Sequence, residues 1–68
     1  MLYLNIRNYI TENGMKLSAV AAKVGIEQQT FYDMMNGKRK IITEEYIEIC
    51  RAFNVPLTYF TENENKSA

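Results

Sequence analysis

Apolar residues recur at helical spacing near the start of the chain. Four of them follow one another at intervals of four, three and one residue and share one helix face: Leu2, Ile6, Tyr9 and Ile10. The pair Asn13-Gly14 follows, and both residue types tolerate the left-handed backbone that ends many helices. The pattern therefore predicts a first helix that ends at this pair.

Two further short helices are expected close together. The second covers about residues 16–24, with an inward stripe of Val20, Ala21 and Val24, and ends at Gly25 in a left-handed C-cap. Met15 is expected to pack just ahead of it. The third covers about residues 28–35, where the inward residues Phe31, Met34 and Met35 stand at i, i+3 and i+4, and Asn36-Gly37 ends it.

The rest of the chain predicts a fourth helix and a short fifth one. Thr43 is a suitable N-cap for the fourth helix, which has acidic residues in its first turn and ends at Asn54. Its buried face is predicted to be Tyr46, Ile49, Cys50 and Phe53. Pro56 suits the first turn of a fifth helix packing through Leu57, Tyr59 and Phe60. We expect an all-α bundle of four to five helices over residues 1–61 and a polar tail over residues 62–68.

Charge is divided unevenly along a chain whose net charge is zero. Residues 1–40 contain six basic and three acidic side chains, a net charge of +3, whereas residues 41–68 contain two and five, a net charge of −3. A generally basic nucleic-acid binder is excluded, but a locally basic one is not. With 68 residues, one small core is the limit.

Several chemistries are excluded by composition. The chain has no His, which removes His-based catalysis and zinc–imidazole sites. The one cysteine, Cys50, can form no internal disulfide and fits a reducing cytoplasm, where a packed thiol is its expected role. The sequence has no membrane-span pattern, phosphate-binding loop or dinucleotide-binding glycine pattern. Neither enzyme activity nor a cofactor is expected.

The closely spaced helices of residues 16–36 are the informative feature. A short Gly-containing turn makes such helices cross steeply, so that the second one projects as a rod that fits the major groove of DNA. The spacing resembles the Cro/phage-repressor (XRE-type) helix-turn-helix family. The resemblance covers nearly all of residues 2–60 and rests on these positions: Met15, Val20, Ala21, Val24, Gly25, Ile26, Phe31, Met34, Asn36 and Gly37, then Ile49, Ala52, Phe53, Val55, Leu57 and Phe60.

The outward face of the third helix supplies the candidate base contacts. Gln28 and Gln29 stand at its start, and the resemblance implies that they touch bases, since a Gln amide can both donate to and accept from adenine. The alternative is ordinary solvated helix surface. Asp33 either accepts from cytosine N4 or repels phosphate, and Tyr32 either contacts DNA or covers core residues.

Candidate phosphate contacts surround that helix. The loop Lys38, Arg39 and Lys40 follows it directly, at the place where the family lays its chain along the DNA backbone. Asn36 and Thr30 are further candidates, although a turn-forming role alone can explain Asn36. Lys16 is a last candidate, because it can act electrostatically at the start of the second helix.

The sequence departs from the family pattern at several positions. Lys16 and Glu27 replace the usual Ser or Thr caps, and Leu17 replaces a Gln that often contacts phosphate. Many members pair a first-helix Arg with a third-helix Glu, and the corresponding residues here are Ile10 and Met35. Two apolar residues in place of a buried ion pair are often neutral or stabilising.

The predicted function is a sequence-specific, double-stranded DNA-binding transcriptional regulator, with repression the expected activity and a homodimer the expected form. Its dimer surface is predicted on the fourth and fifth helices, around Tyr59 and Phe60. The alternative is a protein-interaction module or antitoxin on the same scaffold, with weak or no DNA binding. The acidic second part of the chain and the missing Gln at Leu17 favour that alternative.

Overall fold

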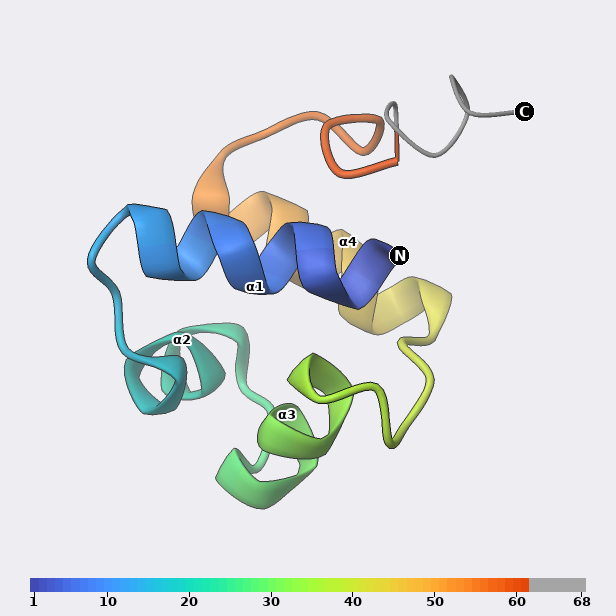
Figure 1. Ribbon diagram of the computed structural model, residues 1–68. Helices are drawn as coiled ribbons and strands as arrows, with labels where there is room; N and C mark the ends of the chain where they lie inside the picture. The colour runs from blue at the N-terminus through green and yellow to red at the C-terminus, as the bar shows by residue number, and fades with distance from the viewer. Residues whose placement is uncertain (62–68) are drawn as a thin grey trace.

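The computed structural model describes residues 1–61, and these contain four helices (Figure 1). Their bounds are α1 Leu2–Glu12, α2 Leu17–Val24, α3 Gln28–Met35 and α4 Thr43–Phe53. The expected all-α fold is confirmed. The predicted tail over residues 62–68 lies outside the described residues. Within the described range, no helix is both long and apolar enough to cross a membrane.

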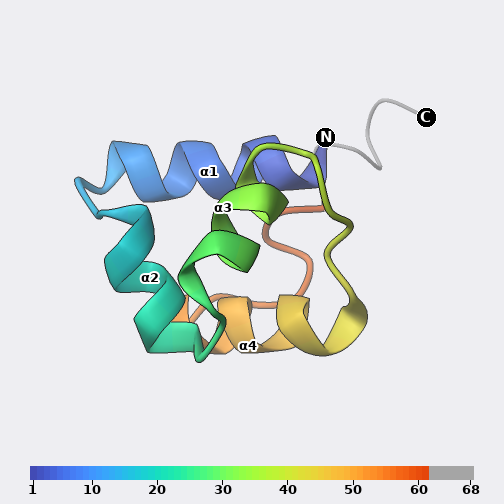
Figure 2. The ribbon, with the colours of Figure 1, turned by 90° about the horizontal axis from the view of Figure 1, so that it is seen from below.

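Three of the helices, α1, α2 and α4, form a frame, and α3 packs against it (Figure 2). In Figure 2, α1 and α4 lie on opposite sides, α2 joins them at one end, and α3 lies in front. Helix α2 packs against both α3 and α4, and α3 also packs against α1. The loop from α3 to α4 passes the N-terminal end of α1 on its way (Figure 2).

The core is built from the apolar stripes of all four helices and from one residue after them. Its buried members are Ile6, Ile10, Val20, Ala21, Phe31, Met34, Met35, Ile49, Cys50 and Phe60. Every stripe predicted from periodicity contributes to this cluster. Met15 is an exception to the prediction, since 39% of it is exposed in the loop between α1 and α2.

Two predicted helix ends are confirmed by their backbone angles. Gly25 caps α2 at φ 76°, and Asn54 caps α4 at φ 58°, both in the left-handed region. In each case the next residue donates its N–H back into the helix, from Ile26 to Ala21 O and from Val55 to Cys50 O, at 3.0 Å. Such bonds satisfy carbonyls that a helix end would otherwise leave without partners.

The predicted N-cap of α4 is wrong by one residue. Ile42, in extended conformation, is the N-cap, and Thr43 is the first helical residue. The Ile42 N–H donates to Glu45 Oε1 at 3.1 Å. Because a carboxylate three residues into the helix satisfies this N–H, the start of α4 does not depend on a hydroxyl cap.

The predicted fifth helix is absent from the described residues, where turns follow Pro56. Two side chains from distant parts of the chain hold these turns: the Tyr46 hydroxyl donates to Leu57 O, and Asn5 Nδ2 donates to Phe60 O at 2.8 Å. Burial raises the pKa of Tyr46 to about 12, so its phenol stays a donor well into the alkaline range. Phe60 is buried against the ring of Tyr9, with centroids 5.5 Å apart, whereas Leu57 and Tyr59 are about half exposed.

Gly37 lies unusually close to α1. A Cβ at this position would lie 2.7 Å from Tyr3 Cζ and 2.9 Å from the Tyr3 hydroxyl oxygen, and φ is 77°. Gly14 has a similar φ of 68°, but a Cβ there would have nothing within 4 Å. Substituting each glycine by Ala therefore distinguishes the cost of backbone strain, which both positions share, from the cost of displacing a side chain, which arises only at Gly37.

We expect Gly14→Ala to cost about 1 kcal/mol, from left-handed strain alone. Gly37→Ala should cost about 2–3 kcal/mol, because the Tyr3 ring must also move away from its site. For a domain of this size each kcal/mol lowers the Tm by about 4–8 °C, which calorimetry resolves. Equal losses for the two variants would contradict the tight contact between Tyr3 and Gly37.

Candidate nucleic-acid interface

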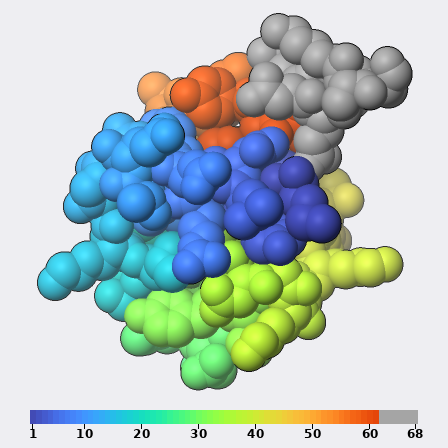
Figure 3. All heavy atoms as spheres, viewed as in Figure 1, coloured from blue at the N-terminus to red at the C-terminus, as the bar shows by residue number. Residues whose placement is uncertain are grey.

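The turn between α2 and α3 sets the angle at which α3 leaves the core. It consists of Gly25, Ile26 and Glu27, with Gly25 left-handed and Ile26 partly buried against the core. Phe31, Met34 and Met35 then fix α3 through one face, each with 0% of its surface exposed. This confirms the predicted inward face of α3. The opposite face forms the lowest part of the molecule in Figure 3, where α3 is drawn in green.

The two glutamines at the start of α3 are exposed, and each is held by a residue one turn further on. Gln28 Nε2 donates to the Tyr32 hydroxyl at 3.2 Å, and Gln29 Nε2 donates to Asp33 Oδ1 at 3.1 Å. Each amide group has two N–H donors and a carbonyl oxygen. One donor and the acceptor of each glutamine therefore remain open toward a ligand, and such surface pairs are weak enough to exchange.

Glu27 caps α3 with its carboxylate. Its Oε1 accepts from the Thr30 N–H at 2.9 Å and from the Thr30 hydroxyl at 3.0 Å. The backbone N–H of Thr30, followed by that of Gln29, lowers the pKa of Glu27, so the group is ionised at neutral pH. The departure from a Ser or Thr cap is thus compensated, and the spacing Glu27-x-x-Thr30 was the available sequence signal. Thr30 already donates its hydroxyl proton within the protein.

The basic residues around α3 differ in whether their side chains already have a partner within residues 1–61. Lys16, Lys38 and Lys40 are exposed, and their side chains have no hydrogen-bond or ion-pair partner among residues 1–61. Lys16 is the N-cap of α2 and makes no side-chain cap bond. Asn36, the C-cap of α3, is exposed as well. These residues are available to an anionic ligand without breaking a contact.

Arg39 is paired with a residue that the sequence pattern did not connect to it. Its Nη1 lies 2.9 Å from Glu45 Oε1 and also donates to Lys40 O at 3.3 Å. The hydrogen bond with Arg39 lowers the pKa of Glu45, and the same bond raises the pKa of Arg39. Since Glu45 also caps α4 through Ile42, this pair ties the basic loop to the start of α4. The remaining guanidinium donors of Arg39 can still bind a second anion.

A short α2, a tight left-handed turn and an α3 that projects with a polar outer face define the helix-turn-helix class of DNA-binding domains. The family model of the Cro/C1-type HTH DNA-binding domain matches residues 5–58, and the chain belongs to this family. The family is non-enzymatic, which agrees with the function class expected from composition. Neither the curated proteins nor the solved structures compared with the chain gave a significant match.

Proposed function

We propose that this protein is a sequence-specific regulator of transcription, a repressor acting in the cytoplasm, that inserts α3 into the major groove of double-stranded DNA. The observation that carries the proposal is the exposed outer face of α3, headed by two adjacent glutamines with open amide groups. A helix is about 10–12 Å wide with its side chains, and the major groove is about 12 Å wide. Family membership supports DNA as the partner.

In this proposal the first turns of α3 read bases. Gln28 and Gln29 contact base edges through their free amide atoms, and Tyr32 and Asp33 lie one turn further along the same face. Asp33 also fixes the amide of Gln29, so it can orient a reader as well as accept from cytosine N4. The proposed phosphate contacts are Lys16, Thr30, Asn36, Lys38, Arg39 and Lys40.

A homodimer forms part of the proposal, because a single α3 reads only about 4–6 base pairs. Two copies would place their α3 helices about 34 Å apart, on half-sites one DNA turn apart. Phe60, predicted for the dimer surface, is only 3% exposed and cannot serve there. Leu57 and Tyr59, which are 52% and 48% exposed, supply the apolar surface at that end instead.

Salt dependence of DNA binding tests the proposal. If Lys16, Lys38, Arg39 and Lys40 neutralise about four phosphates, log K should fall with log salt at a slope of about −3.6 per subunit. Fluorescence anisotropy with mixed-sequence duplex DNA measures this slope. A flat response, or no binding at about 50 mM salt, contradicts the proposal and favours the protein-interaction module.

The double variant Lys38→Ala, Lys40→Ala should make the slope less steep by about 1.8 per subunit. Both lysines are unpaired in the described part of the protein, so the Arg39–Glu45 pair and the fold stay intact. From about 50 to 200 mM salt, the ratio of wild-type to variant affinity per subunit should fall about 12-fold, equally for every DNA sequence. A loss confined to particular sequences would contradict the assignment of these lysines to phosphate.

A further inference from the structure

The two flanks of α3 carry opposite charge. Toward α4, a groove of about 390 Å³ is lined by Glu27 and by Glu44, Glu45 and Glu48 of α4, together with Val24 and Thr30. Toward α1, a groove of about 270 Å³ lies between the first turn of α1 and the basic loop, and Arg39 and Lys40 line it. Glu45 is paired with Arg39, and Glu48 with Arg51. Among residues 1–61, Glu27 and Glu44 on the α4 flank and Lys40 on the α1 flank have no ion-pair partner. A phosphate backbone passing beside α3 is therefore repelled by the α4 flank and attracted by the α1 flank.

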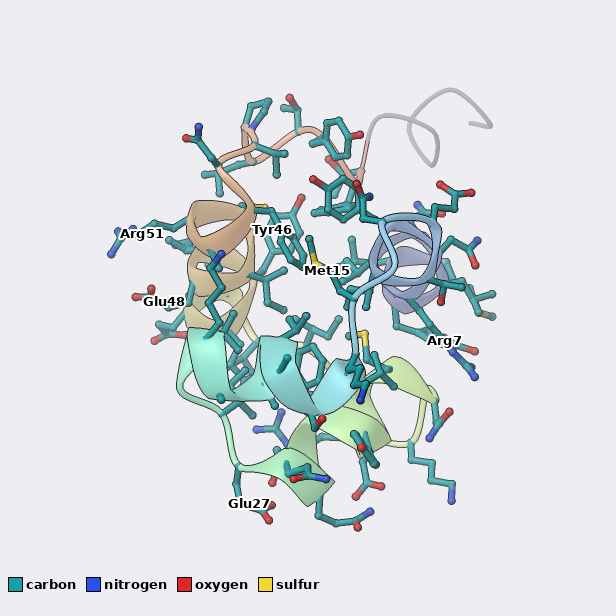
Figure 4. All side chains as sticks on the ribbon, turned by 90° about the vertical axis from the view of Figure 1, so that its left-hand side faces the viewer. Arg7, Met15, Glu27, Tyr46, Glu48 and Arg51 are labelled. Atoms are coloured by element: carbon teal, nitrogen blue, oxygen red, sulfur yellow. The ribbon has the colours of Figure 1, made fainter. Side chains whose placement is uncertain are left out.

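One face of α1 borders the C-terminal end of α3. Tyr3 marks this face, because its ring leaves no room for a Cβ at Gly37. Arg7 stands four residues later and therefore lies on nearly the same face, one turn along. Figure 4 shows Arg7 leaving α1 on the side where α3 lies.

Arg7 is a cation without an assigned role. Its side chain is exposed and makes no hydrogen bond or ion pair with any of residues 1–61. Arg51 is its counterpart on the far side: it is also exposed, points away from α4 in Figure 4, and pairs with Glu48 at 3.4 Å. The two arginines thus carry the same charge on opposite sides of the molecule.

We propose that Arg7 is a further DNA contact, which binds a backbone phosphate on the α1 flank and extends the interface beyond the helix-turn-helix. This inference rests on the proposed function. A guanidinium suits the role because its planar donors can take two phosphate oxygens at once. With Arg7 included, the protein neutralises about five phosphates, and the expected wild-type slope becomes about −4.5 per subunit.

The test compares the salt dependence of three single variants with that of the wild type. Arg7→Gln should reduce the slope by about 0.9 per subunit, so the affinity ratio of wild type to variant falls about 3.5-fold between about 50 and 200 mM salt. Arg7→Lys should retain the slope, since an ammonium also displaces a counterion. The matched control Arg51→Gln removes the same charge from the far side and should leave the slope unchanged.

Each outcome decides the matter. An unchanged slope in Arg7→Gln overturns the contact. An equal change in Arg51→Gln also overturns it, because the change would then come from net charge and not from a contact at Arg7. A wild type that binds no DNA overturns the proposed function together with this inference, and is recognised before any variant is made. Thermal unfolding of Arg7→Gln should match the wild type, since the exposed Arg7 side chain makes no hydrogen bond or ion pair within residues 1–61.

Discussion

Replacing Gln28 and Gln29 together by Ala is expected to abolish most of the discrimination at one or two base positions of the DNA site. Each bidentate contact between a side chain and a base distinguishes the right base from a wrong one by about 1–3 kcal/mol. Tenfold corresponds to about 1.4 kcal/mol, so each lost contact reduces the preference by roughly 5-fold to 150-fold. Both residues are exposed and leave the core untouched, so the variant should unfold at nearly the wild-type temperature.

The measurement begins with selection of a preferred site from random duplex DNA by the wild-type protein. Affinities of wild type and variant are then compared on that site and on each of its single-base substitutions. The wild type should show steep losses at the positions under Gln28 and Gln29, and the variant should show nearly none there. If the variant instead weakens binding to all sequences equally, the glutamines position the protein and do not read bases.

Tyr32→Phe is the matched control for this experiment. It removes the hydroxyl that accepts from Gln28 Nε2 but keeps both glutamines. Because a surface pair of this kind contributes only about 0.2–0.5 kcal/mol, the control tests whether pre-orientation of Gln28 matters beyond the contact itself. A loss of discrimination as large as in the double Ala variant would place the reading role on Tyr32.

Features of the fold that depend on neighbouring residues could be predicted from the sequence. The left-handed ends at Gly25 and Asn54 and the inward face of α3 follow from residue type and 3.6-residue periodicity. The prediction of a fifth helix was wrong because the turns found there are held by contacts with distant parts of the chain. The Leu57 and Phe60 carbonyls are occupied by side chains of Tyr46 and Asn5, the latter 55 residues away in sequence from Phe60.

The same distinction applies to the candidate interface. Which residues of α3 face outward was predictable, but which charges around it are already paired was not. Arg39 was assigned by its place in a basic run, and its bond to Glu45 depends on how the loop folds back over the start of α4. The proposed contact of Arg7 was not predicted from the sequence, because the proposal depends on the packing of α1 beside α3, which no spacing within α1 reveals.

Introducing a carboxylate into the core at Met35 is expected to unfold the protein at neutral pH. Met35 is 0% exposed, and an unpaired buried charge costs about 3–5 kcal/mol, which approaches the whole stability of a small domain. Burial raises the pKa of such a carboxyl, so the folded state holds its proton more tightly than the unfolded state. Met35→Glu should therefore gain stability as pH falls from the raised pKa toward the ordinary pKa of Glu, which urea unfolding at about pH 7 and pH 5 can measure.

Pairing the new carboxylate with an arginine should reverse most of the loss. Ile10 is 1% exposed, belongs to the same core cluster as Met35, and lies on α1, which packs against α3. These are the two positions where the family resemblance implies an Arg–Glu pair. Because an exchange between a buried ion pair and two apolar residues changes stability little when the pair is well formed, Ile10→Arg with Met35→Glu should be much more stable than either single variant. The stability of the double variant is compared with the value expected if the losses of the two single variants simply add. If the double variant is no more stable than that value, Ile10 and Met35 do not face each other across the contact between α1 and α3.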